Sequence, residues 1–489
     1  MTKRILFIVF LFVSSISVFA QKFLDVSKAS EDFKIFEKIL KDGHPSLYDY
    51  IDKEELDTAF NMARASLIED TLDISLFKKM QKITERVKDG HLLLFPPSTL
   101  NTNQYYFPLI LKIIKTDFFI DTDDFGIPIG SKILAVNGKE ISHILEALKK
   151  YAVSDGYNLT RKYRDIELKF GLYYACEYGV TKEFDIKYST PEGIEKTIVL
   201  PSESFVIVKH RNTKRNSYFA KYHSQKDGID FFAEHINKKE PFIYYKHHLK
   251  TAVLVVNSFS GDINAFKSSL IRLFKEIRKN KIKHLVIDIR YNDGGYRPNA
   301  INLFSFVTDT IFKQRTSSFV SSLTIPEKEY STRSYDEKQF LKDKFYNHPV
   351  YDGWKLNFDD LETMMIPNRE RFTGNVYVLA GGATFSAGSS FALLAKNDPD
   401  ILLVGEETGG GYYTHTGQFP VHYKLPNSKI IMVMSMEKIL HYVKDTSIPK
   451  GSGVSPDRTV SLTKEDLIKG KDTQLDYIFK VIHGHTKSK

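Results

Sequence analysis

The chain has 489 residues, of which 69 are Lys or Arg and 60 are Asp or Glu, so its formal net charge is +9. Domains typically contain roughly 100–200 residues, so this length predicts two or three domains rather than one compact core. A hydrophobic fraction of 42% and a charged fraction of 26% are typical of globular proteins and exclude wholesale disorder and a polytopic membrane protein. The small charge excess, without a dominant basic block, gives no support for nucleic-acid binding.

The first 20 residues, MTKRILFIVFLFVSSISVFA, have the pattern of a cleavable signal peptide. Lys3 and Arg4 precede an apolar stretch, and small or β-branched residues lead to Ala20. The apolar part is shorter than the roughly 20 residues that span a bilayer, so we expect cleavage near Ala20–Gln21, with a retained anchor as the alternative. The sequence therefore predicts an exported protein, periplasmic, secreted or associated with the cell envelope, without stable membrane insertion after cleavage.

The numbers and positions of the cysteine and histidine residues bear on disulfides and metal sites. Cys176 is the single cysteine, which excludes intramolecular disulfides and a cysteine zinc site, and we expect it to pack as a small apolar residue. The pair His247-His248 and the tail residues His483 and His485 lack a helical i, i+4 partner or a nearby carboxylate ligand. We therefore expect neither a metal site nor a cofactor.

Residues 22–100 are predicted to form an N-terminal helical domain. Three stretches carry apolar residues at the spacing of a buried helix face. The tetrapeptide KDGH occurs twice, at Lys41–His44 and Lys88–His91, but two four-residue matches do not establish a duplication. The three apolar faces consist of Phe33, Phe36, Ile39 and Leu40, of Leu56, Phe60, Ala63 and Leu67, and of Leu76, Met80, Ile83 and Val87.

Residues 101–201 are predicted to form a compact β-rich module. The strand-like runs FPLILKII, KILAV, FDIKY and KTIVL surround a predicted helix near Ile144–Tyr151. The middle of the module, GIPIGSKILAVNGKEI at Gly126–Ile141, resembles the part of a PDZ domain in which a glycine-led turn precedes a strand and an Asn-Gly hairpin. PDZ domains bind an extended peptide as an added strand. The alternative is a plain hairpin with an Asn137-Gly138 turn.

Residues 202–250 are predicted to form a linker or cap, for which the sequence indicates no function, and their basic stretch Lys209–Arg215 is expected to be a solvated loop.

Residues 251–489 have the pattern of an α/β domain. Val253–Val256 and His284–Arg290 are buried-strand runs on either side of a helix that Asp262 can cap, which predicts a right-handed parallel crossover. The strand 376–380, a helix near 386–396 and the strand 401–404 repeat the unit, residues 308–372 form an insertion, and Leu475, Ile478, Phe479 and Ile482 mark a closing helix.

Three glycine-rich turns follow predicted strands of this domain: DIRYNDGG at Asp288–Gly295, GGATFSAGSS at Gly381–Ser390, and GEETGGG at Gly405–Gly411. In α/β domains ligands gather at the carboxyl ends of strands, so these turns are candidate functional sites. Consecutive glycines allow main-chain N–H groups to face a cavity. Ser386, at a helix start, suits either a nucleophile or an ordinary N-cap. The sequence lacks HExxH, GxxxxGK[ST] and GxSxG, which removes zinc proteases, P-loop proteins and α/β-hydrolases.

The order of these three motifs, followed by GSGVSPDRTV and KGKDTQLDY, resembles the tail-specific or C-terminal processing peptidases. This serine peptidase family has a ClpP/crotonase-like core. The resemblance covers most of residues 30–482, with 202–250 and 308–372 unmatched. It implies a multidomain α/β fold with an N-terminal helical bundle, a PDZ-like β-rich module and a ClpP/crotonase-like peptidase core.

By position in the motifs, the resemblance makes Ser386 the nucleophile. It also implies an oxyanion hole formed by the N–H of Ala387 with that of Gly294 or Gly295. Many family members use a serine–lysine dyad, but this chain has Gly411 in the place of the lysine. A hydroxyl cannot attack without a proton acceptor, so another base is required.

Other branches of the family, which resemble the tricorn core and lantibiotic-cleaving peptidases, use a histidine from a Gly-His pair that follows the helices and precedes a strand. His91 in VKDGHLLLF occupies such a place, and His415 in the glycine turn is the rival base. We expect Glu406 or Glu407 to orient the imidazole, as a carboxylate does in other triads. We expect a structural role for His44.

The sequence therefore predicts an exported serine-type endopeptidase or processing peptidase that hydrolyses peptide bonds of protein or peptide substrates. Two alternatives remain open. A non-catalytic relative that binds peptides or apolar ligands would also lack the usual lysine. The second alternative is a different acyl-transfer or hydrolase reaction on the crotonase-like core, because a fold alone does not fix a reaction. The sequence gives no prediction of oligomeric state.

Overall fold

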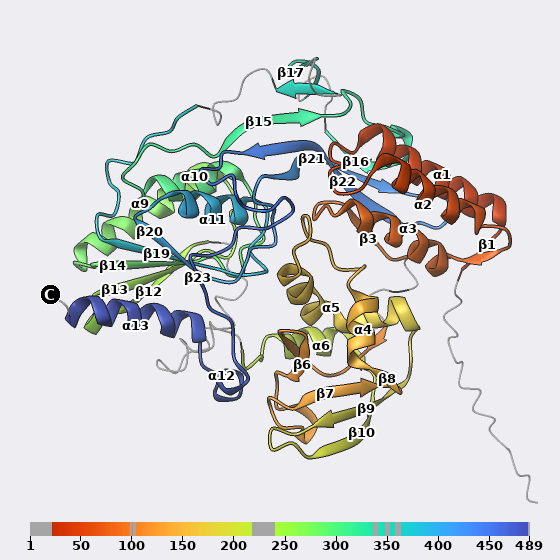
Figure 1. The fold of residues 1–489 in the computed structure, drawn as a ribbon, viewed down its shortest axis with the longest axis horizontal. Helices are drawn as coiled ribbons and strands as arrows, with labels where there is room; N and C mark the ends of the chain where they lie inside the picture. The colour runs from red at the N-terminus through yellow and green to blue at the C-terminus, as the bar shows by residue number, and fades with distance from the viewer. Residues whose placement is uncertain are drawn as a thin grey trace, which may run out of the picture.

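The computed structural model describes residues 22–97, 100, 104–217, 240–335, 341–347, 353–356 and 363–487. Figure 1 shows three parts: a helical layer at the N-terminus, a small β-rich module, and an α/β core that carries a second, antiparallel sheet. The predicted signal peptide at 1–20 lies outside the described residues. Among the described residues, none of the helices combines the length and apolar character that a membrane crossing requires.

Three helices form the N-terminal layer, as the apolar spacing predicts. The Asp25 carboxylate caps the first helix by accepting the Lys28 N–H at 2.9 Å. Phe33, Phe36 and Phe60 are fully buried and pack with ring centroids 5.9–6.2 Å apart. The helices are α1 (Val26–Gly43), α2 (Lys53–Ala65) and α3 (Asp73–Val87), and the short strands β1 (Phe23–Leu24) and β2 (Thr71–Leu72) pair beside them.

The β-rich module is an antiparallel sheet in the order β10-β9-β7-β6-β5, with β8 paired to β7. Asn137 and Gly138, with φ of +49° and +72°, form the predicted two-residue turn between β7 and β8. The elements are β5 (Leu111–Ile114), β6 (Asp117–Ile120), β7 (Lys132–Val136), β8 (Lys139–Glu140), β9 (Glu183–Ser189), β10 (Glu195–Pro201), the 3-10 turn η1 (Asp124–Gly126), and the helices α4 (Ile141–Leu148) and α5 (Thr160–Tyr178). Cys176 is buried in α5, where burial raises the pKa of its thiol to about 12.

One hydrophobic cluster joins the N-terminal helices, the β-rich module and part of the second sheet. Phe36 of α1, Ile144 of α4 and Met434 of the second sheet are all fully buried within it. The parts that the sequence divides at residue 100 therefore share a core, and their relative placement is fixed by apolar packing.

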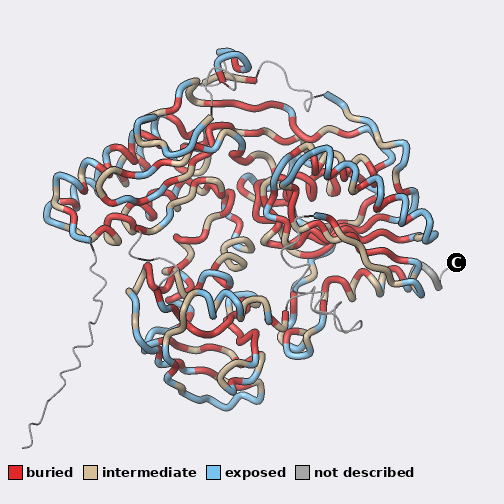
Figure 2. Tube along the Cα trace, turned by 180° about the vertical axis from the view of Figure 1, so that it is seen from behind, coloured by how far each residue is buried: buried red, intermediate tan, exposed pale blue. Residues whose placement is uncertain are grey.

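The α/β core is built on a mainly parallel sheet in the order β12-β13-β14-β19-β20-β23. Helices α9, α10 and α11 cover one face and α13 covers the other, so the central strands are buried throughout (Figures 1 and 2). The elements are β12 (Phe242–Lys246), η2 (His247–Leu249), β13 (Thr251–Val255), α9 (Ile263–Lys279), β14 (His284–Asp288), α10 (Arg297–Ser305), β19 (Asn375–Ala380), α11 (Ala387–Asn397), β20 (Ile401–Gly405), β23 (Arg458–Thr459), α12 (Lys464–Lys469) and α13 (Thr473–Lys487).

The second sheet is antiparallel and has the order β16-β21-β22-β15-β18-β17, with β3 added along β22. Residues 308–372, the predicted insertion, supply four of its strands. Strand β3 comes from the N-terminal part of the chain, so this sheet joins the two ends of the sequence. Its strands are β3 (Leu93–Phe95), β15 (Arg315–Val320), β16 (Ser331–Arg333), β17 (Phe345–Asn347), β18 (Trp354–Leu356), β21 (Thr414–Lys424) and β22 (Ile431–His441), and η3 (Lys328–Tyr330) precedes β16.

The basic stretch Lys209–Arg215 is not the solvated loop that its charge predicts. Residues Phe205–Asn212 form helix α6. The helix directly follows the short strand β11 (Glu203–Ser204), which pairs with β4 (Tyr105–Tyr106). Arg215 is only 5% exposed. A dense run of charges is usually solvated, but the Arg215 guanidinium has enough buried acceptors to compensate for its desolvation.

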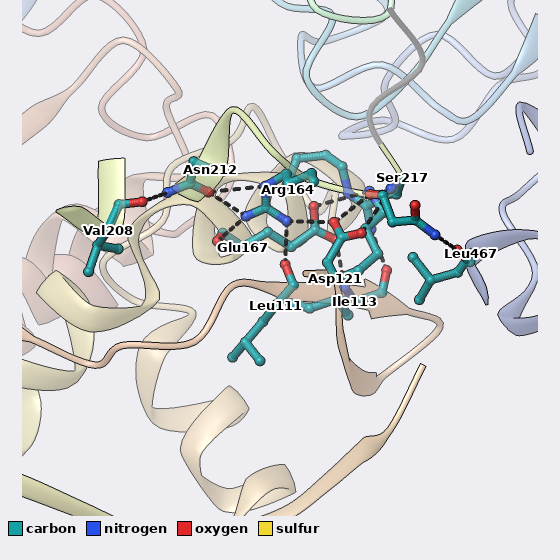
Figure 3. A network of polar contacts seen from close by, with 12 residues as sticks. Leu111, Ile113, Asp121, Arg164, Glu167, Val208, Asn212, Ser217 and Leu467 are labelled. Carbon is teal, nitrogen blue, oxygen red and sulfur yellow. Dashed lines mark hydrogen bonds and ion pairs between the residues drawn. The ribbon is translucent and has the colours of Figure 1, made fainter. Parts of the chain in front are cut away.

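Arg215 connects several segments at once, and Figure 3 labels Leu111, Asp121 and Glu167 among its partners. Its guanidinium forms an ion pair with Asp121 at 2.9 Å and donates to the carbonyl oxygens of Leu111 at 2.6 Å and Glu167 at 2.8 Å. The next residue, Asn216, donates to the carbonyl oxygen of Leu467 in α12. This network therefore attaches the β-rich module to the α/β core.

Replacing Arg215 by Ala leaves the fully buried Asp121 without its cationic partner. Stranding a buried charge costs about 3–5 kcal/mol, so we expect Arg215→Ala to lower the free energy of unfolding by about that amount. Urea denaturation followed by circular dichroism measures the change. The exposed Lys209→Ala is the matched control and should unfold like the wild type; equal stability of both variants would contradict the role of the network.

Candidate active site

The three glycine-rich turns lie together at the carboxyl ends of adjacent strands. Parallel pairing puts Asp288 of β14 beside Leu379 of β19, and Ala380 beside Gly405 of β20. The main chain then connects the turns directly, because the Phe385 N–H donates to the Asn292 oxygen at 2.9 Å. Thr384 accepts the Gly409 N–H through its carbonyl oxygen at 2.9 Å. The sequence predicts candidate functional sites at these three turns, and the structure brings the turns together.

Ser386 lies at a sharp bend immediately before helix α11. Its backbone has φ +50° and ψ −124°, a conformation that L-residues rarely adopt. Its side chain makes no N-cap hydrogen bond, so the hydroxyl is not used in holding the helix start. Such strain persists only where the surroundings enforce it, and it is concentrated at functional sites. Of the two interpretations left open by the sequence, the geometry favours a presented nucleophile over an ordinary N-cap.

Two main-chain N–H groups border Ser386. Ala387 is the first residue of α11, so its N–H has no acceptor within the helix. Gly294 donates its N–H to the Asn292 side-chain oxygen at 2.9 Å. The next residue, Gly295, forms a β-bridge with Phe259. In this bridge the Phe259 N–H donates to the Gly294 oxygen and the Tyr296 N–H donates to the Phe259 oxygen, so neither hydrogen bond uses the Gly295 N–H. The geometry therefore favours Gly295 over Gly294 as the partner of Ala387.

His91 reaches the site on a short loop between α3 and β3. Lys88 ends the helix in the left-handed region, with φ +56°, and β3 pairs with β22 two residues after the histidine. The His91 ring stacks on the ring of Phe385, the neighbour of Ser386, with centroids 4.6 Å apart and planes at 27°. A Cβ on Gly90 would lie 2.5 Å from the Phe385 ring, so only glycine permits this approach.

Burial makes His91 a neutral imidazole at ordinary pH. Burial lowers the pKa of His91 to about 4, against the opposing charge of Asp89 and with the help of the Arg161 charge. Its Nδ1 is buried and has no hydrogen-bond partner among the described residues. A neutral ring can accept a proton, and no hydrogen bond joins it to Ser386 among the contacts of the described residues.

His415, the rival base, stacks on the other imidazole, with ring centroids of His91 and His415 5.6 Å apart. Its Nδ1 is 2.7 Å from Nε2 of His441, whose Nδ1 is 3.0 Å from the Tyr412 carbonyl oxygen. The carbonyl accepts only from an N–H, so His441 donates from Nδ1 and His415 must donate from its own Nδ1. Burial first, and then His441, hold the pKa of His415 well below its usual value.

The two predicted orienting carboxylates point elsewhere. Glu406 forms an ion pair with Arg164 at 3.8 Å and lines a cavity of about 590 Å³ between the β-rich module and the core. Glu407 accepts the Gly453 N–H at 2.6 Å. The structure therefore does not bring the Glu406 carboxylate to His91, and the acidic groups beside that ring belong to other residues.

Asp89 and Asp155 are those acidic groups, and neither is among the site residues predicted from the sequence. A carboxylate oxygen of each lies within 4.8 Å of a ring nitrogen of His91. Asp89 accepts hydrogen bonds from His44 Nε2 and the Thr416 hydroxyl, both at 2.8 Å. Each aspartate precedes a glycine, and these two Asp-Gly pairs were the available signal. Because their oxygens already accept hydrogen bonds, the cluster is poorly suited to a cation.

His44 supports Asp89, in line with the structural role expected for it. Its Nδ1 accepts the Ser46 N–H at 3.1 Å, so Nε2 carries the proton donated to Asp89. Burial favours a higher pKa for Asp89, but the hydrogen bond and charge of His44 hold it below its usual value. The two KDGH sequences are thus connected in space through the histidine of one and the aspartate of the other.

Comparisons with known proteins agree with this geometry. Residues 250–460 match the model of peptidase family S41. The protein is therefore a hydrolase of a serine-type peptidase family. The serine, its bend and the converging turns all lie within the matched S41 domain, whereas His91 and Asp155 lie before it.

Solved structures extend the likeness over nearly the whole chain. Mature CPAF is similar with a TM-score of 0.61 at 15% identity, covering 94% of this chain and 96% of that one. The structure of mature CPAF complexed with lactacystin gives 0.59 at 16%, covering 94% and 98%. A photosystem II D1 C-terminal processing protease gives 0.42 at 14%, covering 91% and 98%. The first two show a shared multidomain α/β fold. No curated protein sequence matches the chain.

The close approach of Gly294 to Ser386 gives a test of the site geometry. A Cβ at Gly294 would lie 2.7 Å from the Ser386 Cβ, and its φ is +112°. We expect Gly294→Ala to displace the serine and lower kcat by about 100-fold, measured as peptide hydrolysis. Gly179→Ala, with φ +90° and open space around it, carries the backbone strain without the clash and should keep its kcat. Equal kcat values in both variants would contradict the packing argument.

Proposed function

We propose that the protein is an exported serine endopeptidase or processing peptidase that cleaves protein or peptide substrates through Ser386, with His91 as the base. The observation that carries the proposal is the stacking of His91 on Phe385, which brings a neutral imidazole to the residue next to the strained serine. Export rests on the signal-like segment at Met1–Ala20.

Each step of the reaction can be assigned to a group of this chain. His91 takes the Ser386 proton as Oγ attacks the scissile carbonyl carbon, and the N–H groups of Ala387 and Gly295 hold the resulting oxyanion. The imidazolium then gives the proton to the leaving amine, which breaks the peptide bond and leaves an acyl ester on Ser386. Water, deprotonated by His91, hydrolyses this ester. Catalytic hydrogen bonds are often long in free enzymes and tighten in the substrate complex. The proposal therefore does not require a His91–Ser386 hydrogen bond in the structure without substrate.

The arrangement of the histidines supports His91 over His415. His415 donates from Nδ1 to His441, and its side chain is buried. His91 lies between that ring and Phe385. We therefore assign His415 the role of a packing partner that fixes the plane of the catalytic imidazole.

The PDZ-like module supports recognition of an exposed chain segment. Such modules bind an extended peptide by adding it to a sheet edge, and the sheet here has two outer strands, β5 and β10. Apolar packing holds the module in the same hydrophobic cluster as the α3 helix that leads to His91. A peptide on the module would therefore be bound by the same rigid assembly that positions the base.

The assignment is tested with a fluorophosphonate probe and a mixed peptide library. Ser386→Ala removes the nucleophile, so we expect loss of both labelling and cleavage. His91→Ala removes the base and should slow acylation by about 10²–10⁴-fold, the usual contribution of general-base catalysis. Labelling is followed by intact-protein mass spectrometry and cleavage by peptide sequencing.

Matched controls come from the same elements. Ser390→Ala lies four residues along α11 with a buried hydroxyl that has no hydrogen-bond partner among the described residues, and it should label normally. His143→Ala changes an exposed histidine. Labelling that survives Ser386→Ala would remove the nucleophile, and an inert wild type would favour the non-catalytic binding relative. Full activity in His91→Ala with none in His415→Ala would reverse the choice of base.

A further inference from the structure

Asp155 connects the base loop to the catalytic core. It follows α4 and precedes α5, in a segment with no assigned role, and it is 3% exposed. Its Oδ1 accepts the Gly90 N–H at 2.8 Å, and its Oδ2 accepts the Gly411 N–H at 3.0 Å. Its own N–H donates to the Gly409 oxygen at 3.2 Å. One carboxylate therefore holds the residue before His91 and the turn beside Ser386 at a fixed separation.

The same carboxylate lies close to the imidazole itself. A carboxylate oxygen of Asp155 is within 4.8 Å of a ring nitrogen of His91, whose buried Nδ1 has no hydrogen-bond partner among the described residues. When His91 takes a proton, both ring nitrogens carry hydrogen and a positive charge develops. Burial alone disfavours this charged form, and a buried negative charge at this distance offsets part of that cost, because charges attract more strongly inside a protein than in water.

We propose that Asp155 is the positioning residue of this active site: its carboxylate holds the His91 loop against the glycine turn and, when ionised, stabilises the imidazolium formed as His91 takes the Ser386 proton. This inference rests on the proposed function, because it assigns the base to His91. It replaces Glu406, which faces Arg164, as the group that orients the ring.

The surroundings of Asp155 determine how its charge depends on pH. Asp89 and His91 face it from the base loop, Arg161 from α5, and Tyr50 from the segment between α1 and α2. Burial and the Asp89 charge raise the pKa of Asp155 to about 7, against the two N–H groups and Arg161. The carboxyl is therefore neutral below pH 7 and ionised above it. Because the pKa of His91 is about 4, a rise of activity near pH 7 would come from Asp155.

The experiment compares pH profiles of kcat for the wild type and Asp155→Asn. We expect the wild-type kcat to rise about 10- to 100-fold through an inflection near pH 7, as the charge forms. An amide cannot ionise, and its NH₂ group cannot accept one of the two N–H bonds. Asp155→Asn should therefore lose the inflection and keep a low kcat, about 100-fold below the wild type at pH 8, with KM little changed.

Asp32→Asn is the matched control. Asp32 is also fully buried and also accepts two main-chain N–H bonds, from Asn427 at 3.0 Å and Ser428 at 2.6 Å. Loss of the Asp32 charge should reduce stability as the loss of the Asp155 charge does, but the kcat profile of Asp32→Asn should keep its inflection near pH 7. A profile of Asp155→Asn that keeps the wild-type inflection and kcat would overturn the proposal.

A measurement on the wild type alone covers the case in which the variant does not fold. In protein labelled with ¹³C-aspartate, we expect one carboxyl resonance to titrate near pH 7; its absence together with a flat pH profile would overturn the proposal. His91→Ala separates this inference from the proposed function. Loss of activity in His91→Ala with a wild-type profile in Asp155→Asn refutes only Asp155, whereas full activity in His91→Ala refutes the base itself.

Discussion

The pairing of β3 with β22 is the constraint on which the active site depends. It registers Leu93 opposite Val433 and so attaches an N-terminal segment to a sheet that lies mostly within residues 250–460. His91 is two residues before this strand, and Ser386 lies far along the chain on the other side of the β-rich module. Closing so long a loop costs entropy that local contacts cannot offset, so the helical layer and β-rich module must bury apolar surface together. The shared hydrophobic cluster provides that burial.

Glycine is required where the segments meet. The turns approach so closely that side chains would collide: a Cβ on Gly295 would lie 2.3 Å from the Ser260 nitrogen, and one on Gly382 would lie 2.6 Å from the Thr160 oxygen. The polar groups of the site are consequently supplied mainly by the backbone. Backbone N–H groups are fixed donors, which suits them both to an oxyanion and to the carboxylates that align the loops.

Local features of the sequence predicted the local features of the structure. Asp262 caps helix α9 as predicted, and the Asn137-Gly138 pair forms the predicted hairpin, because both features depend on neighbouring residues. The glycine turns and Ser386 were found for the same reason. The contacts that were not predicted join distant residues: Asp155 and Gly411 are 256 positions apart, and Asp89 and Thr416 are 327 apart. Periodicity carries no information on such pairs. The burial of Arg215 was missed because its acceptors come from other segments.

The position of Gly411 shows why the base must come from another part of the chain. In the members of the resembled family that use a serine–lysine dyad, a lysine occupies this place, but here a Cβ would lie 2.1 Å from the Thr414 oxygen. The turn therefore has no room for any side chain. Its N–H is bound to Asp155, the same residue that holds the Gly90 N–H next to His91. The position that has lost the lysine thus serves, through its backbone, to anchor the loop that carries the histidine, and the missing lysine is compatible with a competent peptidase.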